Sequence, residues 1–407
     1  MKILYITYDG LTDPLGRSQV LPYILALHQK GIEYVILSCD KPERYFSEKA
    51  AVETLLKPTS IQWVPEEYEH RYPIISAMRN QRKLLKKAVE LAQIHQFDII
   101  HCRSYIPTEI GLRLKQKFGS KVLFDMRGFF PDERVDGGVW NLKNPIYRRI
   151  YNYFKKKEFQ YFTKSDYTIS LTEAGKREIL SREGLSALKI QVITCCADMD
   201  FFNSTQISES RRNEARKSLN ISENASVFTY LGSLGTWYLP EQMLDFAKVY
   251  MHQKTDAVFL FITPDKPEEI YKLAITKGLN IENIRIKKAN REEVPLLLSL
   301  GSFSIFFIKP SFSKKASSPT KMGEILSMGQ PCVCNSSVGD VAEIVKETDC
   351  GVLIETFDEA AYQKAVSKLE KLHFPPEHYR NAAQKYYALE RGVELYYRVF
   401  HLILYPK

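Results

Sequence analysis

Short apolar runs alternate with amphipathic stretches along nearly the whole chain. Most apolar runs end in a loop, and the segment after the loop repeats apolar residues at helical spacing. The predicted strands are 2–7, 33–38, 97–101, 121–124, 166–171 and 190–193, then 227–231, 257–263, 284–286, 304–308 and 331–335. This alternation predicts an α/β protein with two doubly wound, mostly parallel sheets.

The amphipathic stretches predict the helices that cover these sheets. They are 19–30, 74–96, 109–118, 145–162, 173–182, 240–251, 358–372 and a single long terminal helix, 379–404. Residues 8–18 and 129–138 are expected to be loops. The stretch 194–202 joins the two halves, so we expect domains at 1–198 and 203–378, followed by a terminal segment, 379–407, that returns to the first domain.

The composition is that of an ordinary globular chain of two or three domains, with 407 residues, 44% hydrophobic and 26% charged. The longest weakly polar run, 294–308, contains Pro295 and Gly301 and is too short and broken to span a bilayer. The first ten residues lack the apolar region of a signal peptide. Seven cysteines without repeated spacing favour buried thiols in a reducing compartment. We therefore expect a cytoplasmic protein, and no spacing of residues predicts a metal site.

The net charge of +9 admits nucleic acid, an anionic membrane or an anionic substrate as partner. Much of the excess lies in 79–87 and 148–157, and no nucleic-acid recognition motif accompanies it, so a nucleic-acid partner is not expected. The helix 145–162 interleaves aromatic and basic residues. It could lie on an anionic membrane surface, at the inner face of the membrane, or pack on the core with a basic outer face.

One stretch, 317–334, reads SSPTKMGEILSMGQPCVC and carries the clearest chemistry. Ser318 suits the N-cap of a helix that Gly329 ends. Lys321 stands in the first turn, where the helix dipole disfavours a cation. A cation beside the free N–H groups of a helix start can bind phosphate, and Glu324, on the same face, could accept two hydrogen bonds from a ribose diol. The alternative is a solvated polar face.

The order of Glu324, Gly329 and Pro331 after a loop of small residues resembles the donor site of GT-B glycosyltransferases of family 4, which are retaining enzymes. In that family a glutamate at the position of Glu324 binds the donor ribose. Many members carry a second glutamate eight residues earlier, where this chain has Ala316, and a subset with S-P-T-K also lacks it. The resemblance implies two Rossmann-like domains with a cleft between them, the donor bound by the second and the acceptor by the first.

Further landmarks follow the first strand of each half. Gly16 stands where GT-B enzymes use a loop to approach a phosphate or sugar, and Gly232 and Ser233 open the second half. Relatives commonly carry an Arg and a Lys after that glycine, but this chain has Thr236-Trp237-Tyr238. The resemblance therefore implies donor binding by the following residues: Gly16, Gly232, Ser233, Ser318, Thr320, Lys321 and Glu324.

Candidate catalytic residues lie where two predicted strands of the first half end. His101 and Arg103 follow one strand, and Asp125 and Arg127 follow the next. Open parallel sheets bind ligands at this edge. Family 4 members often have His-x-His at the first position, so Arg103 replaces the second histidine, and a purely structural His101 is equally compatible. Lys321 joins this set because a cation can stabilise the departing diphosphate.

The sequence thus predicts a metal-independent glycosyltransferase of hexosyltransferase type. The nucleotide-sugar would be a substrate, so no cofactor is expected, and the acceptor would be a glycan or a lipid-linked sugar in cell-surface polysaccharide or glycoconjugate biosynthesis. Two alternatives remain. One is a sugar-nucleotide epimerase of the same fold, with Asp125 or Asp132 as acid and base. The other is a non-catalytic nucleotide-sugar sensor, which Ala316 and the missing Arg and Lys favour.

Overall fold

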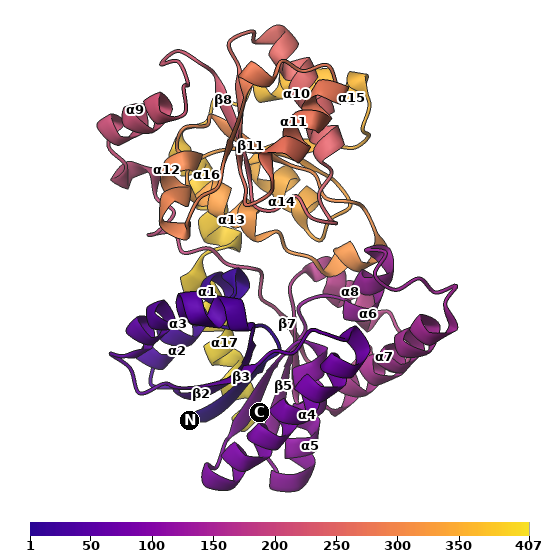
Figure 1. Ribbon diagram of the computed structural model, residues 1–407. Coiled ribbons are helices and arrows are strands. Elements are labelled where there is room, and N and C mark those ends of the chain that lie inside the picture. The colour runs from indigo at the N-terminus through magenta and orange to yellow at the C-terminus, as the bar shows by residue number, and fades with distance from the viewer. Residues whose placement is uncertain (407) are drawn as a thin grey trace. The chain divides into compact units, whose positions relative to one another are not determined.

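The computed structural model describes residues 1–406, which divide into two compact units (Figure 1). The first unit comprises Met1–Thr194, Phe312–Ser317 and the chain from Leu389 onward. The second comprises Cys195–Ser311 and Ser318–Ala388. Each unit contains one parallel sheet covered by helices, which confirms the predicted α/β architecture of two Rossmann-like halves.

The sheet of the first unit has seven parallel strands in the order β3-β2-β1-β4-β5-β6-β7. Its central strands are apolar and buried on both faces, as a parallel sheet with helices on each side requires. The strands are β1 (Lys2–Thr7), β2 (Glu33–Asp40), β3 (Gln62–Glu67), β4 (Ile99–Arg103), β5 (Lys121–Asp125), β6 (Tyr167–Ser170) and β7 (Ile190–Val192).

Helices cover this sheet in two sets. The C-terminal helix α17 packs along α2, and α5 packs against both α4 and α7. The helices are α1 (Pro14–Gln19), α2 (Leu21–Gln29), α3 (Pro42–Leu56), α4 (Pro73–Ile94), α5 (Tyr105–Phe118), α6 (Phe130–Asp136), α7 (Pro145–Lys164), α8 (Glu173–Leu180) and α17 (Leu389–Leu404). The 3-10 turn η4 (Phe312–Ala316) packs against α6 and α8.

The sheet of the second unit has six parallel strands in the order β10-β9-β8-β11-β12-β13. Stacked rings of Phe228, Phe259 and Phe303 fill its centre. The strands are β8 (Val227–Leu231), β9 (Val258–Ile262), β10 (Ile284–Lys287), β11 (Phe303–Phe306), β12 (Cys332–Asn335) and β13 (Gly351–Ile354). The helices are α9 (Glu209–Ser218), α10 (Pro240–Gln253), α11 (Pro267–Thr276), α12 (Val294–Leu298), α13 (Thr320–Ser327), α14 (Val341–Thr348), α15 (Glu359–Leu369) and α16 (Pro376–Tyr386), with short turns η1 (Ser204–Gln206), η2 (Ile281–Asn283) and η3 (Arg291–Glu293).

Both sheets reverse their strand order next to the first strand of the unit. In the first unit β1 lies between β2 and β4, and in the second β8 lies between β9 and β11. Loops that leave neighbouring strands in opposite directions open a crevice at such a switch point, and open α/β sheets bind ligands there. A ligand is therefore expected at the carboxyl ends of β1 and β4, and of β8 and β11.

Three predictions of local structure were wrong. The stretch 129–138 is not a loop, because α6 forms there, and 8–18 contains α1. The single terminal helix is broken into α16 and α17 at Tyr387 and Ala388. The backbone N–H of Ala197 donates to the carbonyl of Tyr387, and Ala197 pairs with Ala388 as an isolated bridge. These contacts hold the break against the segment around Ala197. A helical spacing pattern does not reveal contacts with such a distant segment.

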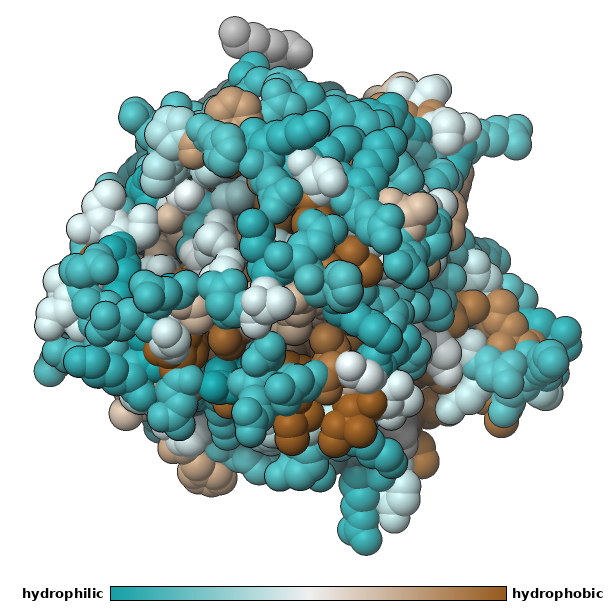
Figure 2. Space-filling model, turned by 90° about the horizontal axis from the view of Figure 1, so that it is seen from above, coloured by the Kyte–Doolittle hydropathy of each residue, from teal (hydrophilic) through white to brown (hydrophobic). Residues whose placement is uncertain are grey.

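The exposed face in Figure 2 is mainly hydrophilic, with hydrophobic side chains in several small patches. The largest exposed apolar side chains are spread over different elements, such as Phe46 on α3, Ile94 on α4 and Ile275 on α11. None of the helices in residues 1–406 is both long and apolar enough to cross a membrane.

Candidate functional site

The helix α13 carries the candidate donor-binding residues of the second unit. It begins at Thr320 and not at Pro319, so the prediction of Ser318 as its N-cap was wrong. The hydroxyl of Ser318 instead accepts a hydrogen bond of 3.2 Å from the backbone N–H of Cys195. Because the hydroxyl has this partner, it anchors the chain that enters the helix.

Lys321 lies in the first turn of α13 and is buried, with 7% of its surface exposed. The alternative of a solvated polar face is therefore wrong for Lys321. Its Nζ lies 3.6 Å from the ring centre of Tyr238 and 4.2 Å from that of Tyr230, and it donates to the Tyr230 hydroxyl at 3.2 Å. Burial lowers the pKa of Lys321 well below its usual value, although Glu324 and Asp265 oppose this shift. An anion at Nζ would restore the charge that burial disfavours.

The loop that leaves β8 approaches this amine closely. Gly232 has φ +105°, and a Cβ at this position would lie 3.4 Å from the Nζ of Lys321. Asp265 holds the loop by accepting hydrogen bonds from the backbone N–H of Leu234 (2.6 Å) and the hydroxyl of Ser233 (3.3 Å). Gly232, Ser233 and Lys321 are thus brought together at the carboxyl end of β8, which is the switch point of the second sheet.

Glu324 lies one turn further along α13 and is half-buried. Within residues 1–406 its carboxylate has no hydrogen bond to the protein. Burial raises the pKa of Glu324, while Arg291 and Lys321 act in the opposite direction. A half-buried carboxylate without a donor can accept two hydrogen bonds from a ligand hydroxyl pair.

Gly16, the remaining donor-binding candidate, lies in α1 of the first unit. A Cβ there would come within 2.2 Å of the Gly10 carbonyl oxygen and 2.6 Å of the Leu11 Cα. Glycine is therefore required for α1 to pack on the loop that leaves β1. Packing explains this glycine without any ligand.

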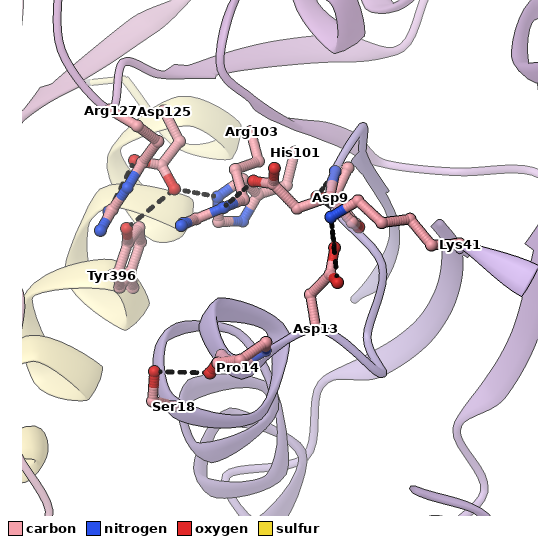
Figure 3. A network of polar contacts seen from close by, with 11 residues as sticks. Asp9, Asp13, Pro14, Ser18, Lys41, His101, Arg103, Asp125, Arg127 and Tyr396 are labelled. Carbon is pink, nitrogen blue, oxygen red and sulfur yellow. Dashed lines mark hydrogen bonds and ion pairs between the residues drawn. The ribbon is translucent and has the colours of Figure 1, made fainter. Parts of the chain in front are cut away.

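The four catalytic candidates of the first unit meet at the carboxyl ends of β4 and β5 (Figure 3). We call His101, Arg103, Asp125 and Arg127, together with Asp9 and Tyr396, the β4–β5 cluster. Asp125 lies at its centre and accepts hydrogen bonds from His101 Nε2 (3.3 Å), Arg127 Nη1 (3.3 Å) and the Tyr396 hydroxyl (3.1 Å).

The pKa values of Asp125 and His101, at the centre of the β4–β5 cluster, shift in directions that preserve the hydrogen bond between them. Burial alone would raise the pKa of Asp125, but the guanidinium of Arg127 and the hydrogen bond from His101 outweigh it and hold that pKa below its ordinary value. Burial lowers the pKa of His101, against the attraction of Asp125. A neutral His101 that donates from Nε2 to an ionised Asp125 leaves its Nδ1 as an acceptor, and that buried atom has no protein partner in residues 1–406.

Arg103 is incompletely paired, with the buried Tyr5 hydroxyl and Asp9 as its partners. It is 4% exposed, and its Nε lies 3.4 Å from Asp9 Oδ2, longer than the 2.7–2.9 Å usual for charged N–H to carboxylate bonds. Its Nη1 is buried and has no partner among the described residues. Figure 3 shows the side chain extending toward Asp9, whose own side chain is 47% exposed.

Sequence reasoning missed several members of both sites. Tyr396 belongs to α17, and 271 residues separate it from Asp125. Tyr230, Tyr238 and Asp265 come from strands and loops whose patterns resemble ordinary core and turn residues. Asp132 was considered as an acid or base, but it accepts hydrogen bonds from Tyr151 and Lys155 of α7 and is a structural partner of that helix.

Metal binding has no support from side-chain clustering. Among residues 1–406 there is no group of three or more His, Cys, Asp or Glu side chains placed to hold an ion. All seven cysteines are buried, and none of them forms a disulfide in residues 1–406. Positive charge in the two sites comes instead from Lys321, Arg103 and Arg127.

Comparisons with protein families match both halves of the chain. Residues 20–201 match the family described as Glycosyltransferase Family 4, and residues 211–386 match the family described as Glycosyl transferases group 1. The comparison with curated proteins found no match.

Solved structures share the fold at low sequence identity. A glycosyltransferase from Rickettsia africae ESF-5 aligns over 100% of this chain and 99% of its own, with 14% identity and a TM-score of 0.73. Anabaena HepE in complex with UDP and glucose aligns over 98% and 99%, with 12% identity and a TM-score of 0.69. Sucrose-phosphate synthase from Thermosynechococcus elongatus aligns over 98% and 99%, with 14% identity and a TM-score of 0.70.

Proposed function

Because the chain belongs to family 4 of the GT-B glycosyltransferases, a family of retaining enzymes, we propose that it transfers a sugar from a nucleotide-sugar donor with retention at the anomeric carbon. The observation that carries the proposal is the placement of Lys321 and Glu324 on α13, beside the glycine loop that leaves β8. This arrangement offers a cation for a diphosphate and, one turn away, a carboxylate for a ribose.

The leaving group decides which residues matter in the chemical step. The bond between the anomeric carbon and the donor diphosphate breaks, an acceptor hydroxyl oxygen forms the new bond, and its proton is lost. The nucleoside diphosphate departs with one additional negative charge. Lys321 Nζ is held in place by the rings of Tyr230 and Tyr238, so it can stabilise that charge without reorganising. It also occupies the role that an Arg and a Lys after the glycine fill in relatives.

The acceptor would bind the first unit, near the β4–β5 cluster. We propose a glycan or lipid-linked acceptor, with a hexose as the transferred sugar.

The first turns of α4 expose Ile74, Ile75 and Met78 beside Arg79 and Arg82, a combination that suits contact with an anionic membrane surface. Two lysines of α7, Lys155 and Lys157, by contrast pair with Glu158 and Glu109 of the same unit. Membrane contact would involve α4, where apolar and basic side chains are exposed together.

A panel of nucleotide-sugars tests the proposal, with release of nucleoside diphosphate and loss of donor measured in the presence and absence of EDTA. We expect one donor to be consumed with diphosphate release and the rate to survive the chelator. An epimerised sugar nucleotide with no net diphosphate release would instead indicate the epimerase. Tight binding without consumption would indicate a sensor.

Two variants then separate the roles on α13. Glu324→Gln should raise the apparent KM for the donor, because hydrogen bonds from a ribose to a charged acceptor are worth about 1.5–3 kcal/mol each. Lys321→Ala should lower kcat and kcat/KM together by about 10²-fold, the usual effect of losing one preorganised charge-stabilising donor. Wild-type kinetics in both variants, with melting temperatures unchanged, would rule out the donor site on α13.

A further inference from the structure

We propose that Arg103 and Arg127 receive an anionic group of the acceptor, a phosphate or a carboxylate, so that the substrate class on the acceptor side is a negatively charged sugar or lipid-linked sugar. The inference rests on the proposed transferase function, because it assigns the first unit to the acceptor.

The position of the two arginines comes first. Arg103 is the last residue of β4, and Arg127 follows the last residue of β5 by two positions. Arg103 pairs in register with Asp125, two residues before Arg127, so the two arginines lie at the same edge of the sheet. β4 is also one of the two strands at the switch point, where parallel sheets bind ligands.

Arg103 has a buried nitrogen atom, Nη1, that lacks a hydrogen-bond partner among the described residues. A guanidinium has five N–H donors, and here Nη1 is buried without an acceptor while Nε reaches Asp9 only at 3.4 Å. A buried charged donor without a partner is costly, and such groups in native structures require an explanation. A ligand oxygen at Nη1 would supply it.

Two carboxylates, Asp125 and Asp9, balance the charge of the arginines in the β4–β5 cluster. Asp125 is engaged by His101, Arg127 and Tyr396, which leaves Asp9 as the carboxylate nearest to Arg103. Asp9 is about half exposed, so it can turn toward water when a ligand takes its place. A carboxylate or phosphate presents two oxygens in the spacing that a guanidinium fork matches, whereas a neutral hydroxyl presents one.

Another arginine of the same unit, Arg182, is paired more tightly than Arg103. Arg182 Nη1 donates to Glu158 at 2.6 Å, so this chain can pair a partly buried arginine tightly where the role is structural. Arg103 is more deeply buried and yet more loosely paired.

Binding of simple anions tests the site without any sugar transfer. Inorganic phosphate and, separately, acetate are added to the full chain carrying Lys321→Ala, which removes the cation of the donor site, and the melting temperature is measured. Phosphate, acetate or both should raise it, and adding Arg103→Gln should abolish the rise. Arg113→Gln, which removes an equal charge at an exposed site of α5, is the matched control and should leave the rise intact. If neither anion raises the melting temperature, or if the rise survives Arg103→Gln, the proposal is overturned.

Acceptor preference then tests the role in transfer. With the donor found by the panel, rates to glucose, glucose 6-phosphate and glucuronic acid are compared. We expect an anionic acceptor to be preferred by about tenfold or more, the effect of one charged hydrogen bond, and the preference to vanish in Arg103→Gln. Arg103→Lys, which keeps the charge but not the fork, should retain part of it.

The two proposals fail in different ways. If no donor releases its diphosphate, the transferase function fails, and the anion titration still decides the site. If transfer proceeds equally well to neutral and anionic acceptors, the function stands and the anionic acceptor is wrong.

Discussion

The β4–β5 cluster and a second group of charged residues in the same unit differ in how completely their atoms are paired. The second group, which we call the α7 cluster, consists of Asp132, Lys155, Glu158 and Arg182 with Tyr105 and Tyr151. Glu158 accepts from Lys155 at 2.7 Å and Arg182 at 2.6 Å, and Tyr105 donates to its other oxygen. Asp132 accepts from Tyr151 and Lys155, both at 2.9 Å.

The β4–β5 cluster has longer contacts and unpaired atoms. Its charged contacts measure 3.3–3.4 Å, and both His101 Nδ1 and Arg103 Nη1 are buried without a protein partner in the described chain. Short, complete pairing offsets the desolvation of buried charge, whereas incomplete pairing leaves donors for a ligand. The comparison therefore assigns the α7 cluster to stability and the β4–β5 cluster to binding.

The largest expected effect is on the stability of the α7 cluster. Arg182→Gln leaves buried Glu158 short of its closest cation, and breaking a buried pair costs about 3 kcal/mol or more. The free energy of unfolding, from urea denaturation followed by tryptophan fluorescence, should fall by that amount. Arg113 is 57% exposed and lies 3.4 Å from Glu109, which keeps its shorter contact with Lys157. Arg113→Gln should therefore change the free energy of unfolding by less than about 1 kcal/mol. Equal losses in the two variants would contradict a structural role for the α7 cluster.

The next effect concerns the hydrogen bond between Tyr396 of α17 and Asp125 in the β4–β5 cluster. Tyr396→Phe removes a hydroxyl that donates to ionised Asp125 and should cost about 1.5 kcal/mol, since hydrogen bonds to charged groups are worth about 1.5–3 kcal/mol. Limited proteolysis should release the C-terminal helix sooner in this variant than in wild type. A variant as stable as wild type would show that α17 docks without this bond.

The pH dependence of stability gives a smaller effect. Burial lowers the pKa of His101 below its ordinary value of 6.5, so the unfolded chain binds this proton more readily than the folded one. Stability should therefore fall as the pH drops below about 6.5, by at most about 1.4 kcal/mol per pH unit from this group. Tyr5, Arg103, Asp125, Arg127 and Tyr396 surround the ring, and Asp125 stays ionised in this range.

Denaturation at several pH values between 5 and 8 checks this prediction. The difference between wild type and His101→Gln should disappear gradually as the pH falls, because the variant lacks the penalty for protonation. A difference that stays constant with pH would mean that His101 does not titrate differently in the folded state.

The smallest expected effect is on the stability of Arg103→Gln. Its ion pair with Asp9 is 3.4 Å long and Asp9 is half exposed, so the free energy of unfolding should change by less than about 1 kcal/mol. Urea denaturation under the conditions used for Arg182→Gln measures it. A loss as large as that of Arg182→Gln would mean that both arginines mainly stabilise the fold. It would contradict the distinction between the α7 cluster and the β4–β5 cluster.

Much of the fold and part of the site could be predicted because they depend on local patterns. Strands β4 and β5 end at the residues where apolar runs give way to His101, Arg103, Asp125 and Arg127, so their meeting follows from parallel topology. In the same way, the placement of Glu324 one turn after Lys321 follows from helical spacing.

The rest depends on contacts between distant segments. The sequence left open whether Lys321 binds an anion or lies on a solvated face, because its own helix shows only a polar position. Tyr230 and Tyr238 cover the amine from β8 and the following loop. Tyr396 reaches Asp125 from α17, and Ser318 is bound by Cys195, which no local pattern indicates. Asp132 was treated as a loop residue because α6 is short and its pairing with α7 is not visible in its sequence.

The most direct test of the account is the rate of sugar transfer per folded molecule, expressed as kcat/KM for the acceptor, in Arg103→Gln and Arg182→Gln at a temperature where both are folded. If the β4–β5 cluster binds the acceptor and the α7 cluster only stabilises the fold, kcat/KM for the anionic acceptor should fall by about tenfold or more in Arg103→Gln and stay within about twofold of wild type in Arg182→Gln. Equal kcat/KM in the two variants, or a loss only in Arg182→Gln, would contradict it.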